Sequence, residues 1–270
     1  MPLVSVVMPV FNGERFLESA VASVLAQEYE PLELVAVNDG STDGSGAILD
    51  RLAAMDRRVR VVTQENRGHA GAMNAALEHA RGEFVAVLDC DDEALPGRLD
   101  AQVAALQADP SLAAVGGAVV LWSEEKGDFF TTVPFVEATE VRRILETTVG
   151  CPLLHSAMTM RRDVVLSVGG YRAALSLALD YDLWLRIVET RDIANLSRPV
   201  VRYRIHSGQT TGTKTESVAI VNGVGRLAAR ARRSGKPDPV PDKRMSVDEL
   251  VRHVGLDRHE IADSVVYYAC

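Results

Sequence analysis

The carboxylates of Asp89 and Asp91 stand one residue apart in the segment Asp89-Cys90-Asp91-Asp92, directly after the apolar run Phe84–Leu88. Carboxylates placed just past a buried strand can present oxygen atoms to one hard cation. Mg²⁺ and Mn²⁺ prefer such ligands, and they often bind through few protein carboxylates together with substrate phosphates. The same acids would also cap the helix that follows, so this segment alone leaves metal binding and helix capping equally open.

Two further polar turns follow apolar runs earlier in the chain. Asp39 ends the run Leu32–Val37, which is where open α/β sheets bind nucleotides, although Asn38-Asp39-Gly40-Ser41 also fits an ordinary turn. Asn66-Arg67-Gly68 opens a helix, and a helix N-terminus beside an arginine suits a diphosphate. The first run lacks GxGxxG and is followed by Phe11-Asn12-Gly13-Glu14, and no GxxxxGKS/T occurs. A dinucleotide cofactor and a P-loop are therefore disfavoured.

The elements that position these turns alternate in type along the first half of the chain. Short apolar runs predict strands, and helical spacing of apolar residues predicts helices between them. The expected strands are Leu3–Pro9, Leu32–Val37, Val59–Thr63 and Phe84–Leu88, and the expected helices include Glu14–Gln27 and Ala70–Ala80. This alternation predicts an α/β fold with a Rossmann-like, mostly parallel central sheet flanked by helices. Ligands bind such sheets beyond the carboxyl ends of the strands, where the polar turns lie.

The second half has a less regular pattern. It predicts strands at Val115–Trp122, Phe129–Val133, Ser156–Met160 and Val200–Arg204, and helices at Glu140–Thr148, Asp180–Glu189 and Thr215–Arg233. A proline-rich linker then precedes two capping boxes, Ser246 with Glu249 and Asp257 with Glu260, which predict two short helices. We therefore divide the chain into a main domain, 1–212, and a small helical C-terminal appendage, 213–270. Within the main domain, 1–110 is the expected nucleotide-binding half and 111–212 the acceptor half.

Composition narrows the class of protein. The 270 residues are 47% hydrophobic and 24% charged, an ordinary globular mixture that excludes a largely disordered chain. The formal net charge of −8 argues against a nucleic-acid partner. Three scattered cysteines indicate a reducing compartment, and no run reaches the ~18 apolar residues of a membrane span. The first residues lack the basic flank of a secretory signal, so we expect a cytoplasmic protein.

Taken together, these residues resemble the family-2 glycosyltransferases with the GT-A fold. The family's successive landmarks are matched in order by Val4–Asn12, Val37–Asp43, Asn66-Arg67-Gly68 with Ala72 and Asn74, Leu88–Asp92, Gly169-Gly170-Tyr171, Asp180–Leu185 and Tyr203–His206. Each motif is loose, but the ordered set at these spacings is specific. The resemblance covers roughly Leu3 to Thr211, and the residues after Ser234 have no such match.

The resemblance implies a role at each matching position. Asp39 would hold the nucleotide base in a pocket lined by Pro9, Phe11 and Asn12, and Asp89 would contact the ribose or reach the metal through water. Asp91 would bind the Mn²⁺ or Mg²⁺ that bridges the two donor phosphates. His206 is the candidate for a histidine that approaches this metal, with a surface-loop histidine as the other interpretation. The remaining substrate-binding positions are Glu14, Asn66, Arg67, Gly68 and Asn74.

Asp180 matches the catalytic base of the family. It also opens a helix, so capping is the alternative, and Asp182 would face elsewhere on that helix. One departure is Leu179, where the family commonly has an acidic residue. His155 follows a Gly-Cys-Pro turn and is placed either on the acceptor side of the cleft or at the start of a buried strand.

The resemblance implies a metal-dependent enzyme that inverts the anomeric carbon of a nucleoside-diphosphate sugar, a UDP-sugar by expectation. The acceptor would be a saccharide or lipid-linked saccharide of a cell-surface polysaccharide or glycolipid. Basic residues in 226–236 either form a solvated helix end or contact anionic lipid peripherally. Two alternatives stay open: a sugar-nucleotide nucleotidyltransferase, disfavoured by the lack of a glycine- and lysine-rich first loop, and a non-catalytic nucleotide-sugar-binding protein, which would need no base.

Overall fold

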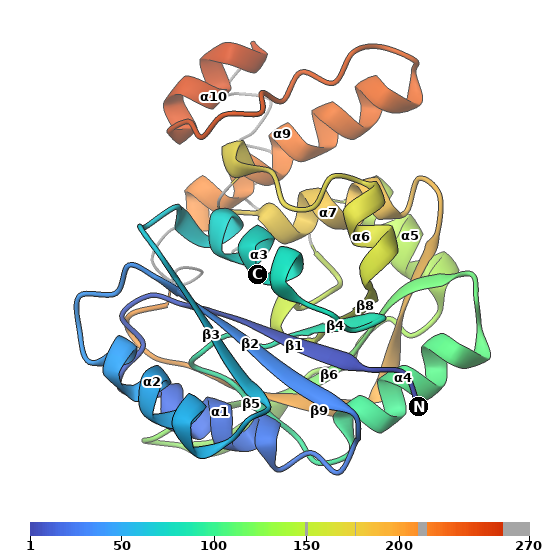
Figure 1. Cartoon of the computed structure of the whole chain (residues 1–270). Coiled ribbons are helices and arrows are strands. Elements are labelled where there is room, and N and C mark those ends of the chain that lie inside the picture. The colour runs from blue at the N-terminus through green and yellow to red at the C-terminus, as the bar shows by residue number, and fades with distance from the viewer. Residues whose placement is uncertain (149–150, 176, 210–214, 256–270) are drawn as a thin grey trace.

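The computed structural model describes residues 1–148, 151–175, 177–209 and 215–255. One curled sheet runs through the molecule and has helices on both faces (Figure 1). The strands are β1 (Val4–Val10), β2 (Leu32–Asp39), β3 (Val59–Gln64), β4 (Phe84–Val87), β5 (Glu93–Ala94), β6 (Leu112–Ser123), β7 (Gly127–Thr131), β8 (Thr159–Arg161) and β9 (Asp192–Arg204). The helices are α1 (Leu17–Leu25), α2 (Ser45–Met55), α3 (Gly68–His79), α4 (Arg98–Ala108), α5 (Ala138–Thr147), α6 (Arg162–Ser167), α7 (Leu179–Ile187), α9 (Thr215–Arg233) and α10 (Val247–Val254), with short 3₁₀ turns η1 (His155–Ala157) and η2 (Ala173–Leu175).

The first half of the sheet is parallel, as its continuous apolar runs predict. The strand order is β3-β2-β1-β4-β8-β6-β9-β5, and β7 pairs with β6. Every residue of β2 is buried, because helices cover both faces. On one face Val6 and Met8 of β1 pack with α1, and on the other Val7 packs with α3. The parallel strands β2, β1 and β4 therefore deliver their carboxyl ends to one edge.

The second half of the sheet is mixed. Strand β8 runs antiparallel to β4 and β6, whereas β6 and β9 are parallel. The strand expected at Ser156–Met160 begins later, because His155–Ala157 form η1. Strand β9 is longer than expected, because the pairing of β6 with β9 continues across Pro199, and its register shifts on both sides of Ala118. A proline donates no N–H, so a strand tolerates it at such an irregularity.

The C-terminal helices pack onto the main domain. Val221 and Val224 of α9 belong to the same hydrophobic core as Trp184 of α7, and Figure 1 shows α9 and α10 stacked above α7 and α3. The capping box of Ser246 and Glu249 is confirmed. The one expected at Asp257 and Glu260 lies outside the described residues. None of the described helices is long and apolar enough to span a bilayer.

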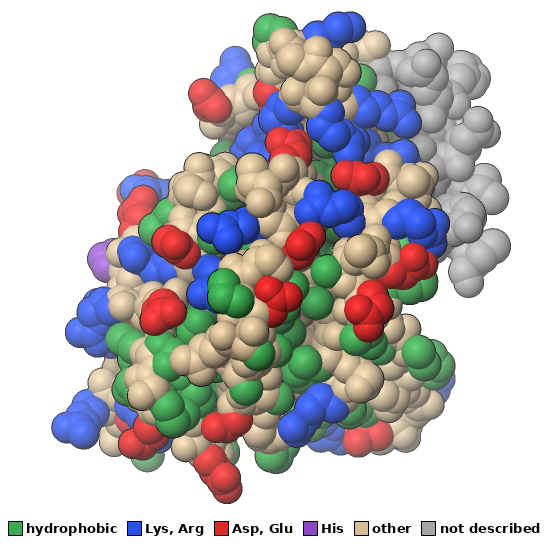
Figure 2. Space-filling model, turned by 90° about the vertical axis from the view of Figure 1, so that its right-hand side faces the viewer, with side chains coloured by type: hydrophobic (Ala, Val, Ile, Leu, Met, Phe, Trp, Pro, Cys, Tyr) green, Lys and Arg blue, Asp and Glu red, His purple; other side chains and the backbone are tan. Residues whose placement is uncertain are grey.

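Lysine and arginine side chains gather in the upper part of Figure 2, interspersed with acidic ones. Within the basic segment 226–236, Arg232 pairs with Glu189 and Asp238, and Arg233 pairs with Glu146. These ion pairs connect α9 to the main domain and to the linker after it. They favour a packing role for these two arginines.

Candidate active site

A cavity of about 630 Å³ lies at the carboxyl ends of the parallel strands and extends to α7. Residues from both halves of the chain line it. The expected site residues among them are Pro9, Phe11, Asp39, Asn66, Gly68, Asp89, Asp91, His155 and Asp180. The structure thus brings four separated carboxylates into one cavity.

Asp39 holds the wall of this cavity together at the end of β2. Its Oδ1 accepts hydrogen bonds from Gln64 Nε2 at 2.6 Å and from the backbone N–H of Arg67 at 2.8 Å. No described residue donates to Oδ2. The buried carboxylate therefore fixes the Asn66–Gly68 turn with one oxygen, and its other oxygen has no donor among the described residues.

Four of the expected substrate-binding residues do not line the cavity. Asn12 accepts from the backbone N–H of Thr42 at 2.8 Å, and Glu14 accepts from that of Gly44 at 2.6 Å, so both join the turn after β1 to the turn after β2. Asn74 exchanges hydrogen bonds of 2.7 and 2.9 Å with the backbone of Tyr171. These three residues hold neighbouring segments of the chain together. The fourth, Arg67, is exposed at the N-cap of α3.

Asp91 and His206 meet beside the cavity. His206 Nε2 lies 2.9 Å from Asp91 Oδ2, and both side chains are partly exposed. Oxygen atoms of Asp89, Asp91 and Asp92 lie within 4.8 Å of one another. An imidazole nitrogen beside convergent carboxylates is a donor set that suits Mn²⁺, and carboxylate oxygens with water suit Mg²⁺ as well.

Buried and unpartnered oxygens support a cation at this position. Asp89 Oδ1 and Asp92 Oδ2 are both buried without a hydrogen-bond partner in the described part of the chain. Burial and the neighbouring Asp91 raise the pKa of Asp89 to about 7. A bound divalent cation would offset this repulsion between carboxylates.

Asp92 is an acid whose role sequence reasoning missed. Its Oδ1 accepts from the backbone N–H of Arg204 at 2.9 Å, which ties the acidic turn to β9 and so places the neighbouring segment of His206. Arg98 is also fully buried; its guanidinium donates to the carbonyl oxygens of Val87 and Met158. Its positive charge acts on both Asp89 and Asp92.

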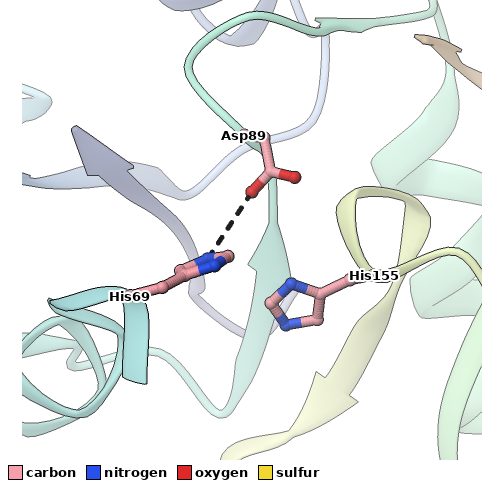
Figure 3. Close-up of side chains that lie close together, drawn as sticks. All are labelled: His69, Asp89 and His155. Carbon is pink, nitrogen blue, oxygen red and sulfur yellow. Dashed lines mark ion pairs between the residues drawn. The ribbon is translucent and has the colours of Figure 1, made fainter. Parts of the chain in front are cut away.

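A second cluster joins Asp89 to two histidines. Figure 3 shows His69 from α3, Asp89 from the turn after β4 and His155 from η1 facing one another. His69 Nε2 lies 3.9 Å from Asp89 Oδ1, and both atoms lack a hydrogen-bond partner among the described residues. His155 Nε2 bonds the Tyr171 hydroxyl at 2.8 Å. His69 is a residue that sequence reasoning missed.

One ligand atom from each of His69, Asp89 and His155 lies within 4.8 Å of the others, and His69 Nε2 lies 3.9 Å from Asp89 Oδ1. Such a group could hold a metal ion or bind a polar group of a ligand through hydrogen bonds. Burial lowers the pKa of His69 to about 4 and that of His155 well below its usual range, so both rings are neutral and each can donate or accept.

Asp180 and Asp182 are separated by their surroundings. Asp180 is the second residue of α7 and lines the cavity, and burial raises its pKa. Asp182 is fully buried and does not line the cavity; its Oδ2 accepts from Arg172 Nε at 2.9 Å and from Arg186 Nε at 3.0 Å. The expectation that Asp182 faces elsewhere is confirmed. Of the two, only Asp180 lines the cavity.

Comparison with known proteins identifies the family. Residues 5–167 match the model of glycosyl transferase family 2. The chain belongs to this family. This glycosyltransferase is 33% identical over 192 residues to the putative glycosyltransferase EpsE of Bacillus subtilis, a match that covers 70% of this chain and 67% of that one. It is 30% identical over 215 residues to the O-antigen biosynthesis glycosyltransferase WbnJ of Escherichia coli. That match covers 78% of this chain and 82% of WbnJ.

Solved structures confirm the GT-A fold of the glycosyltransferase. TarS 1–349 of S. aureus, in complex with UDP-GlcNAc, superposes with a TM-score of 0.65 at 19% identity, covering 85% of this chain and 72% of that one. The mannosyltransferase PcManGT from Pyrobaculum calidifontis, in complex with GDP-Man and Mn²⁺, gives 0.61 at 21% identity, covering 99% and 74%. At these identities the likeness concerns the fold, and the α/β class expected from the sequence is confirmed.

Proposed function

We propose that this glycosyltransferase moves a sugar from a nucleoside-diphosphate sugar to a hydroxyl group of a saccharide or lipid-linked saccharide, with a divalent cation and with inversion. The observation that carries the proposal is one cavity with Asp91 and His206 paired on its metal side and Asp180 lining the acceptor side. A transferase needs both features: charge compensation for a leaving diphosphate and a separate base for the acceptor.

The donor binds along the carboxyl edge of the parallel strands. Asp39 Oδ2 accepts a hydrogen bond from the base, and Pro9 and Phe11 form the adjoining wall of the cavity. Asp91, His206 and Asp89 hold the Mn²⁺ or Mg²⁺. A cation there supplies positive charge beside the diphosphate. His69 and Asp89 bind a hydroxyl group of the donor, because His69 Nε2 and Asp89 Oδ1 face each other at 3.9 Å and neither has a hydrogen-bond partner among the described residues.

Asp180 acts as the general base. The acceptor oxygen attacks the anomeric carbon while the bond from that carbon to the diphosphate oxygen breaks on the opposite face. The acceptor proton passes to a carboxylate oxygen of Asp180. Burial raises the pKa of Asp180, which strengthens it as a base above that pKa. The products are an inverted glycoside and a nucleoside diphosphate.

The relatives indicate the type of substrate. The TarS structure contains UDP-GlcNAc and the PcManGT structure contains GDP-Man with Mn²⁺. WbnJ is named for O-antigen biosynthesis. By these likenesses the donor is a UDP- or GDP-sugar, and the acceptor belongs to a surface polysaccharide.

A panel of nucleotide sugars tests the proposal. The purified protein is incubated with each UDP- and GDP-sugar and Mn²⁺, with and without EDTA. The expected result is slow release of nucleoside diphosphate from one donor, abolished by EDTA. Release of pyrophosphate would mean nucleotidyl transfer instead. Binding without turnover, also in the presence of acceptor saccharides, would mean a binding protein.

A further inference from the structure

The segment that leads into α10 contacts the rim of the cavity. A Cβ atom on Gly68 would lie 3.3 Å from Cζ and from Nη1 of Arg244. Gly68 lines the cavity and adopts a positive φ of 76°, so the backbone there is open to close approach. We propose that Arg244 of the C-terminal appendage binds the nucleoside end of the donor, an inference that rests on the proposed function.

Arg244 is held in place from both sides. Before it, Val240 is buried and Asp238 pairs with Arg172 at 2.8 Å. After it, Met245 packs against the main hydrophobic core and Leu250 of α10 is buried in it. The capping box of Ser246 and Glu249 fixes the start of α10, two residues after Arg244. This anchoring reduces the entropy lost when the guanidinium binds a ligand.

The cavity lining carries negative charge that a cation could balance. Among the described residues, the lining contains four carboxylates, from Asp39, Asp89, Asp91 and Asp180, and neither lysine nor arginine. An anionic donor therefore needs cations from the metal and from the rim. Arg244 is exposed and makes no ion pair or side-chain hydrogen bond with any described residue, and Arg67, beside Gly68, is also exposed. Both guanidinium groups are available to a ligand.

The position of Gly68 indicates which part of the donor Arg244 contacts. The backbone N–H of Arg67 bonds Asp39 at the end of β2. Asp91 follows β4, and β1 separates β4 from β2, so the two strands lie about 10 Å apart. Arg244 is therefore on the base side of the cavity, away from the Asp91–His206 pair. A planar guanidinium stacks on a nucleobase or donates to its carbonyl oxygens.

Calorimetry on the full chain with Mn²⁺ tests this role. The ligands are UDP or GDP, whichever the wild type binds more tightly, and inorganic pyrophosphate. We expect Arg244→Ala to weaken nucleotide binding about tenfold and to leave pyrophosphate binding unchanged. Arg244→Lys should restore little, because it keeps the charge without the plane. Lys243→Ala is the matched control, since it removes the same charge from the exposed neighbouring residue.

The outcomes separate this inference from the proposed function. Equal nucleotide affinity of wild type and Arg244→Ala would overturn the role of Arg244 and leave the transferase proposal intact. An equal loss of pyrophosphate affinity would overturn the assignment to the nucleoside end. A wild type that binds neither nucleotide would remove the proposed function and this inference together. Circular dichroism and the thermal midpoint of Arg244→Ala verify that the variant is folded.

Discussion

His206 Nε2 lies 2.9 Å from Asp91 Oδ2, although 115 residues separate them in the chain. The pair joins the acidic turn after β4 to the segment after β9, so the proposed metal site forms only when both halves have folded. Asp92 supports this junction through the backbone N–H of Arg204. A side chain from the second half thereby becomes part of a site that the first half begins.

Asp91→Ala and His206→Ala should each remove the effect of Mn²⁺ on nucleotide binding without unfolding the protein. Each substitution deletes one ligand, and both side chains are partly exposed, so the loss of packing is small. Calorimetry with the bound nucleotide, with and without Mn²⁺, measures the effect. Asp50→Ala, an exposed carboxylate on α2, is the control. If EDTA left the nucleotide affinity of the wild type unchanged, that result would argue against a metal site.

Asp39→Ala should weaken nucleotide binding without changing the metal requirement. A hydrogen bond to a charged acceptor is worth about 1.5–3 kcal/mol, roughly ten- to a hundredfold in affinity. Asp39 also fixes the Asn66–Gly68 turn, so Gln64→Ala is the control, because it removes another bond to the same oxygen. If Gln64→Ala were as weak a binder as Asp39→Ala, the effect would come from the turn and not from the base.

The parallel core could be predicted because its signals are local. Continuous apolar runs identify β1, β2 and β4, and polar residues directly after them identify Asp39, Asp89 and Asp91. The partners of these residues are not local. Asn74 and Tyr171 are 97 residues apart, and the Asp92 carboxylate accepts a hydrogen bond from the backbone N–H of Arg204, 112 residues away. The sequence around His69 predicts a helix but does not indicate that His69 lies beside Asp89, so this proximity is known only from the structure.

Asp89→Asn should make the metal-free protein more stable than the wild type near neutral pH. The folded pKa of Asp89 is about 7, above its ordinary value of 3.8. Folding therefore favours the protonated form, and the wild type loses stability as the pH rises from about 4 to about 7. The asparagine variant lacks this loss. The thermal midpoint of both proteins across pH 4–8 with EDTA measures the difference, which should shrink when Mn²⁺ is added. Parallel curves would show that burial leaves this carboxyl unaffected.

Asp180→Asn should keep donor affinity and lose transfer. Asparagine has nearly the shape of aspartate but cannot take the acceptor proton, and general-base assistance is typically worth about 10²–10⁴-fold. Turnover should therefore fall at least about a hundredfold, while the thermal midpoint stays near that of the wild type or rises, because burial opposes the charge of Asp180.

Asp182→Asn should show the opposite pattern. It removes the buried charge that pairs with Arg172 and Arg186, and breaking such a pair costs about 3–5 kcal/mol of folding free energy. The fraction that remains folded should turn over donor and acceptor near the wild-type rate, because Asp182 does not line the cavity. Stability from urea unfolding and kcat per folded molecule separate the two effects. If Asp182→Asn were folded but inactive and Asp180→Asn were active, Asp182 would be the base. That result would contradict the assignment to Asp180, which rests on the positions of the two carboxylates in α7.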